Sequence, residues 1–186
     1  NVKEQDKVLI NWALLRIGQF SDKNFFMRHV LEGDKNAAKA LGDFNDTEAQ
    51  FYYYLFFGRL NAALNVQDSQ KYLSDVLLNA QEQNLRTHGV KLLEIISSME
   101  EVLKQGLIRV ISKGGWPDNV KIVAINALAK EKYEPAVDVL IETLAKEKKS
   151  GEKADIVQSA RDALGQLSSK RARLYFRLRS NMAEID

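Results

Sequence analysis

The feature that most constrains this chain is a hydrophobic pattern that returns about every 35 residues. Apolar or small side chains at offsets 0, 4, 7 and 8 form one face of a helix over residues 120–128, and the same offsets recur 36 residues later and 35 residues earlier. The positions are Val120, Ala124, Ala127, Leu128, then Ile156, Ala160, Ala163, Leu164, and Leu85, Gly89, Leu92, Leu93. A period of this length is typical of arrays of stacked helix pairs.

A second set of helices shares another template, with apolar or small residues at offsets 0, 3, 4 and 7. Its positions are Val137, Leu140, Ile141, Leu144, then Leu103, Gly106, Leu107, Val110, and Leu73, Val76, Leu77, Ala80. The repeating unit is therefore predicted to be a helix, a short turn and a second helix. In the clearest copy, residues 130–134 form the turn and Pro135 lies in the first turn of the second helix, where a missing N–H is tolerated.

Residues 119–144 resemble a HEAT repeat, with basic Lys121 after Val120, alanines along the first helix, and a proline opening a second helix that ends in leucines. Residues 155–167 resemble the first helix of a further copy. A tetratricopeptide array has nearly the same period, but its Gly-Tyr-Ala-Phe pattern is absent in register. The resemblance implies an all-α fold of the α-α superhelix class, a right-handed solenoid of about five antiparallel helix pairs.

We expect residues 1–186 to form a single HEAT-like repeat domain, with the clearest repeats over 85–167 and a basic C-terminal capping helix over 168–186. Residues 46–65 and 6–20 have suitable helical periodicity without the alanine positions, and 33–45 has room for a short extra helix. The chain does not begin with Met, so a processed protein and a fragment of a longer one both stay open. We favour a cytoplasmic protein, with an exported mature protein as the alternative.

Composition argues against several classes of protein. With no cysteine, the chain has no disulfide, thiolate metal site or cysteine nucleophile. No run approaches the roughly 18 consecutive apolar residues of a membrane helix, so we predict no membrane insertion. Of two histidines, His29 has only Glu32 at ligand spacing and His88 has no such partner, whereas zinc needs three or four ligands.

No catalytic motif stands out either. The sequence has no nucleophile elbow and no glycine-rich phosphate loop. The double glycine at 114–115 is predicted to end one helix, with Trp116 packing at the turn and Pro117 near the first position of the next helix. We therefore predict a non-enzymatic protein without metal or cofactor.

Residues 51–57 place six aromatic rings on seven positions, so a helix here has no ordinary polar face. Either the helix lies between neighbouring helices, or some of its rings form a recognition patch. Tyrosine supplies a large contact area and a hydrogen-bonding hydroxyl, and it is enriched at interface hot spots. Tyr52 and Tyr53 are the candidates for exposed, partner-binding rings.

Positive charge is concentrated at the C-terminal end of the chain. From Ser168 onward there are five basic and two acidic residues, so this segment has a net charge of +3. The whole chain has a net charge of +2, so the residues before Ser168 have a net charge of −1. At about 100° per residue, Lys170, Arg173 and Arg177 share one helical stripe, and Phe176 lies beside them. These four residues are candidate contacts for a partner.

Leu174 and Leu178 form an apolar stripe next to the cations, which we expect to dock on the last repeat as a capping helix. The basic stripe then serves solubility, or binds an acidic protein surface. An interleaved aromatic also suits single-stranded nucleic acid, but a broad basic face is missing, so nucleic acid is an unlikely partner.

HEAT-like arrays mostly serve as scaffolds, so the resemblance implies a protein–protein interaction scaffold or adaptor that binds a protein partner on the solenoid surface. Enzymes among HEAT-like proteins supply the alternative, either DNA glycosylases for alkylated bases or bilin lyases. Neither family's distinctive residues can be placed on this chain. Bare solenoid ends tend to associate, so self-association through the ends is a further expectation.

Overall fold

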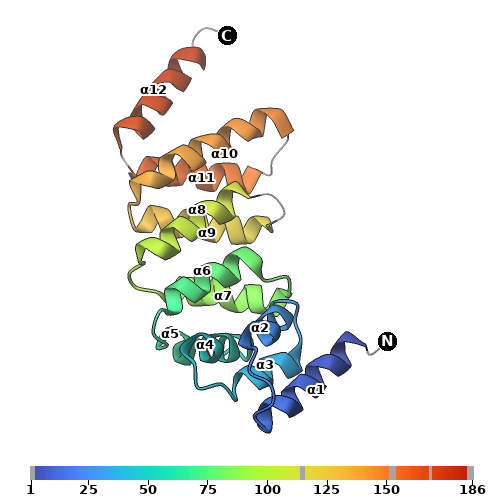
Figure 1. Cartoon of the computed structure of the whole chain (residues 1–186). Helices are drawn as coiled ribbons and strands as arrows, with labels where there is room; N and C mark the ends of the chain where they lie inside the picture. Colours follow the sequence, from blue (N-terminus) through green and yellow to red (C-terminus); the bar gives the residue numbers. More distant parts are fainter. Residues whose placement is uncertain (1–2, 114–115, 151–153, 168, 184–186) are drawn as a thin grey trace. The chain divides into compact units, whose positions relative to one another are not determined.

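A computed structural model describes residues 3–113, 116–150, 154–167 and 169–183 (Figure 1). The described residues contain twelve α-helices and no strand. The all-α prediction is therefore confirmed. The chain divides into two compact units, Asn1–Ser97 and Ser98–Asp186, which are described separately below.

The α-helices of the first unit are α1 (Glu4–Arg16), α2 (Lys23–Leu31), α3 (Lys35–Leu41), α4 (Thr47–Phe56), α5 (Leu60–Leu64), α6 (Ser69–Asn79) and α7 (Gln83–Ile95). Helix α4 is central, because it packs against α2, α3, α5, α6 and α7. Helix α1 packs on α3, and α3 is the short extra helix predicted within residues 33–45.

Residues 46–65, for which the sequence indicated helical periodicity, form two helices separated at Gly58. The Gly58 N–H donates to Leu55 O at 3.0 Å and the Arg59 N–H donates to Tyr54 O at 2.8 Å, which closes the end of α4. Gly58 has φ +68°, and a Cβ there would lie 3.1 Å from the His88 ring. Both the backbone and the neighbouring ring therefore favour glycine at this position.

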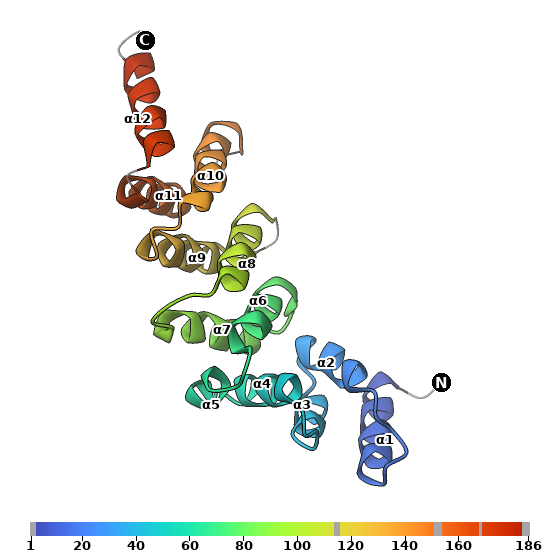
Figure 2. The ribbon, with the colours of Figure 1, turned by 60° about the vertical axis from the view of Figure 1, so that its left-hand side comes forward.

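The helices of the second unit are α8 (Glu101–Ser112), α9 (Asp118–Lys130), a 3₁₀ turn η1 (Glu134–Ala136), α10 (Val137–Ser150), α11 (Ala154–Leu167) and α12 (Lys170–Ala183). Helix α8 packs beside α9 and α10 beside α11, while α9 packs on α11 and α8 on α10 (Figures 1 and 2). The unit predicted from the sequence joined α9 with α10, and these helices lie in successive layers. A period fixes the length of a repeat but not the point at which a layer begins.

The repeated apolar positions do face inward. Of the 24 positions in the two templates, all but Ala127 and Ile141 are buried, and these two are half-buried. Burial of one apolar stripe per helix is the main favourable term in a stack of this kind.

The turns before α9 and α10 differ slightly from expectation. Pro117 is the N-cap residue of α9, one position before the helix, and Pro135 lies in the η1 turn that precedes α10. Trp116 is buried, as predicted for a packing residue. The predicted helix end at 114–115 lies outside the described residues.

Candidate functional site: the outer face of the C-terminal helix

Helix α12 begins at a side-chain cap. The Ala172 N–H donates to Ser169 Oγ at 3.1 Å, and the Arg173 N–H donates to Ser169 O at 3.0 Å. A hydroxyl in this position satisfies an amide that has no partner within the helix. From this buried start the helix leads away from α10 and α11, the helices that it contacts (Figure 2).

The side of α12 that packs on α10 and α11 is centred on Ala172, which is 1% exposed. Tyr175 and Phe176 are half-buried, and their ring centroids lie 5.7 Å apart in an edge-on arrangement. On a helical wheel with about 100° per residue, Tyr175 lies about 60° to one side of Ala172 and Phe176 lies about 40° to the other side. A small residue between two rings lets the helix approach closely while the rings supply the buried area.

The predicted docking of Leu174 and Leu178 on the last repeat is wrong. Each side chain is 55% exposed, on the side of α12 away from Ala172. The helix has two apolar arcs, and the arc with Ala172 and the two aromatic rings is less exposed than the arc with the leucines. The leucines therefore face solvent together with the cations.

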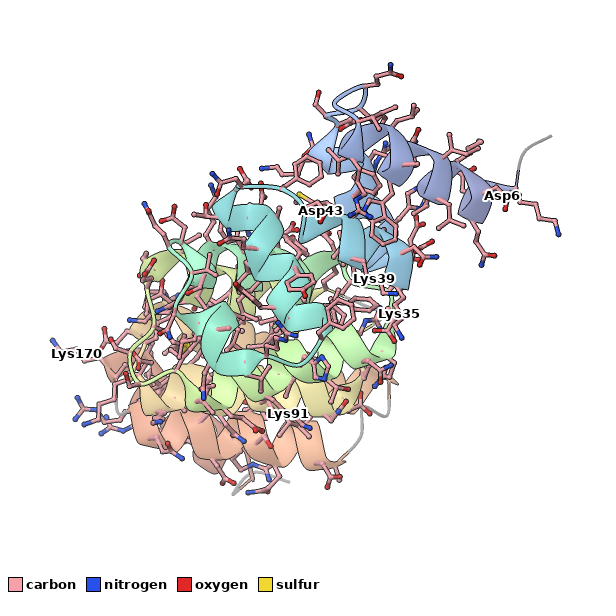
Figure 3. All side chains as sticks on the ribbon, turned by 90° about the horizontal axis from the view of Figure 1, so that it is seen from below. Asp6, Lys35, Lys39, Asp43, Lys91 and Lys170 are labelled. Atoms are coloured by element: carbon pink, nitrogen blue, oxygen red, sulfur yellow. The ribbon has the colours of Figure 1, made fainter. Side chains whose placement is uncertain are left out.

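Lys170, Arg173 and Arg177 are exposed and lie on one side of the leucines, in the stripe predicted from the sequence. Figure 3 shows the Lys170 side chain extending away from the ribbon. We call Lys170, Arg173, Leu174, Arg177 and Leu178 the outer face of α12. Phe176 is half-buried on the opposite side of the helix, so of the four candidate residues of the tail three are exposed and one is not.

Arg171 lies on the other side of the leucines, so cations flank the apolar stripe on both sides. Its guanidinium contacts the Asp138 carboxylate at two points, with both N–O distances 2.9 Å. Both side chains are exposed, so this two-point contact orients Arg171 more than it stabilises the fold. The sequence pattern predicted no role for Arg171, although this residue lies about 60° from Leu174 on the helical wheel.

A hollow of about 580 Å³ lies beside the first turn of α12. Its lining combines apolar, acidic and basic side chains from η1, α10 and the start of α12, namely Glu134, Pro135, Val137, Ser169, Lys170 and Arg171.

The other candidate residues lie in the first unit, on α4. Tyr52 is 0% exposed, so the expectation of an exposed ring at this position is wrong. Its hydroxyl donates to the Asp75 carboxylate, which also accepts from Asn79 Nδ2 at 2.6 Å. Burial raises the pKa of the Tyr52 hydroxyl well above its usual range, and the neighbouring Asp75 charge adds to this effect.

Tyr53 is half-buried. Its ring packs edge-on against Phe57 at 5.1 Å and lies under the Arg59 guanidinium at 5.5 Å. A Cβ at Gly42 would come within 3.0 Å of this ring, so the glycine makes room for it. Tyr53 thus combines a structural contact with a partly exposed edge.

The two histidines are held by local contacts. His29 Nδ1 lies 3.3 Å from Glu32, with its Nε2 3.7 Å from Glu4, and His88 Nδ1 lies 2.9 Å from Leu55 O. Among the described residues, no group of three or more His, Cys, Asp and Glu side chains is placed to hold a metal ion. Within the same residues, none of the helices has the length and apolarity needed to cross a membrane.

Comparison of the chain with protein-family models, with curated proteins and with solved structures found no match. The resemblance to HEAT repeats therefore depends on the residues quoted above, and function has to be argued from the surfaces that the structure leaves exposed.

Proposed function

We propose that this protein is a non-enzymatic interaction scaffold, a HEAT-like right-handed solenoid that binds a protein partner on its surface. The layered packing of α8 with α9 and α10 with α11 supports this proposal, since stacked helix pairs bury one stripe per helix and leave the others for contacts. A fold alone does not define an activity, so a particular exposed surface has to support the proposed function.

The observation that carries the proposal is the outer face of α12. Leu174 and Leu178 expose more than half of their side-chain surface one helical turn apart, beside three exposed cations. All five residues are exposed, on the side of α12 away from buried Ala172. An apolar centre with a charged rim is the usual composition of a protein-binding patch.

Affinity capture from the source organism, followed by quantitative mass spectrometry, tests this function. Three baits are compared: the native chain, Leu174→Ser/Leu178→Ser, and the control Lys35→Glu/Lys39→Glu. The control changes two exposed lysines one turn apart on α3, in the other unit (Figure 3). We expect a partner that the native and control baits retain and the leucine variant loses.

Two results contradict the proposal. One is that all three baits capture the same proteins in equal amounts, while circular dichroism shows that the three baits have the same helix content. The other is release of an alkylated base from DNA, or a chromophore absorption band on the purified protein, which favours the enzymatic alternative. A Tyr53→Ser bait tests in the same experiment whether the partly exposed ring of α4 contributes a second contact.

A further inference from the structure

We infer that the partner segment bound by the outer face of α12 is an acidic amphipathic helix. Its aliphatic side chains pack on Leu174 and Leu178, and its carboxylates pair with the cations on both sides. This inference rests on the proposed function and specifies the chemistry of the partner.

The apolar stripe sets the shape of the partner. Leu174 and Leu178 are four residues apart, so their Cβ atoms are about 5–6 Å apart on one side of the helix. A second helix presents aliphatic side chains at the same spacing and can interdigitate with this pair. The stripe is short and convex, so a helix with its own i, i+4 pair fits it better than an extended strand, which needs a sheet edge.

The charges set the composition of the partner. Lys170, Arg173 and Arg177 lie on one side of the leucines and Arg171 lies on the other. The only carboxylate in contact with these four residues, within the described part of the chain, is that of Asp138, which pairs with Arg171. Carboxylates flanking the aliphatic pair of the partner therefore meet cations, whereas lysines there meet like charges.

Two other classes of ligand fit the same surface less well. A membrane surface attracts cations, but stable interfacial helices bury a broad apolar side. Among the α12 side chains that the structure describes, only two large aliphatic ones are exposed. Nucleic acid uses the cations and leaves the exposed leucines without a role. The combination of leucines and cations favours an acidic helix.

The probes are three fluorescein-labelled peptides of about 20 residues with one helical leucine stripe, flanked by Glu, by Gln or by Lys. Fluorescence anisotropy at about 50 and 150 mM salt measures their binding to the full chain. We expect the Glu peptide to bind roughly tenfold or more tightly than the Gln peptide, to weaken at the higher salt, and the Lys peptide not to bind.

Variants of the protein test each half of the inference. Leu174→Ser/Leu178→Ser should weaken binding of the Glu peptide by about tenfold or more. Arg173→Glu/Arg177→Glu should reverse the preference toward the Lys peptide. Lys35→Glu/Lys39→Glu, with the same charge change at the same spacing on α3, should leave binding unchanged.

Several outcomes overturn the inference. These are equal binding of the Glu and Lys peptides, insensitivity to the leucine variant, absence of binding to the Glu peptide, and binding instead to phosphatidylserine vesicles. A dimer in light scattering that the leucine variant abolishes assigns the surface to a second copy and also overturns it. A captured partner that depends on the leucines but shows no charge preference contradicts this inference alone, whereas failure of the capture experiment contradicts the proposed function.

Discussion

Helices α4 and α12 are both rich in large apolar and aromatic side chains, and the structure uses them in opposite ways. Helix α4 packs against five neighbouring helices, and Phe51, Tyr52 and Leu55 are fully buried among them. Helix α12 contacts α10 and α11 and leaves Leu174 and Leu178 exposed. The number of neighbouring helices, and not the composition of a helix, decides whether its apolar side chains serve the core or remain available to a partner.

The largest expected difference is in stability. Phe51→Ala should lower the free energy of unfolding of the first unit by about 3–5 kcal/mol, because it leaves a cavity beside Tyr52 and Tyr72. Leu174→Ala should change stability by no more than about 0.5 kcal/mol. Urea unfolding checks both, with single-tryptophan variants that keep Trp12 in the first unit or Trp116 in the second. A large loss at Leu174 contradicts the comparison.

Tyr52→Phe removes the phenol that donates to Asp75, so we expect a loss of about 2 kcal/mol at neutral pH. The raised pKa of Tyr52 keeps its proton on the folded chain, whereas an unfolded tyrosine loses it near pH 10. This contribution to stability is present below about pH 10 and falls as pH rises further.

The variant should therefore lose less stability than the native chain between about pH 9 and pH 11, measured by urea unfolding. Tyr54→Phe, which removes a phenol from the same helix, is the matched control. If stability falls with pH equally in Tyr52→Phe and in the native chain, burial does not raise the pKa of the Tyr52 hydroxyl, and the prediction is wrong.

Removing a helix cap should cost less stability than removing Phe51, and the effect should spread further in the first unit than at α12. Asp46 Oδ1 accepts from the Ala49 N–H at 3.0 Å and from Lys23 Nζ at 2.8 Å, and the Lys23 contact lowers the pKa of Asp46. Asp46→Ala should destabilise the whole first unit by about 1–2 kcal/mol. Ser169→Ala should cost about 1 kcal/mol and act only on α12.

Hydrogen exchange followed by mass spectrometry checks this difference. Faster exchange over α2 to α7 in Asp46→Ala, against faster exchange confined to α12 in Ser169→Ala, is the expected result. Faster exchange through α10 and α11 in Ser169→Ala shows that α12 is part of their cooperative unit.

The smallest effect belongs to the exposed pair of Arg171 and Asp138. Asp138→Asn should change the free energy of unfolding by no more than about 0.5 kcal/mol. This difference should disappear at about 1 M salt, because the screening length there is only roughly 3 Å. Urea unfolding at low and high salt measures it. A loss above about 1 kcal/mol means that the pair anchors α12 to α10 and is no longer a surface contact.

Sequence patterns predicted the inward-facing residues of the repeats well, because a helical stripe such as Val120, Ala124 and Leu128 has only one way to be buried in a stack. They did not predict how layers are formed, since the same period allows α9 to share a layer with α8 or with α10. They also missed the end of α4, although Gly58 is a recognised helix-ending residue.

The candidate site was predicted in part, for a geometric reason. The helical wheel of residues 170–178 placed the cations correctly but offers two apolar arcs, and only the neighbouring helices decide which one is covered. Tyr52 shows the converse problem. Its hydroxyl suggested exposure, yet Asp75 on α6 satisfies it inside the unit, and that contact spans 23 positions of the sequence.

The attachment of α12 through Ala172 and the two flanking rings has an evolutionary consequence. Substitutions on its exposed outer face leave the core unchanged, so they are nearly neutral for folding. Positions on α4 have no such freedom, because each change also alters a packed neighbour. Selection for stability therefore leaves the outer face of α12 free to diverge while α4 stays constrained.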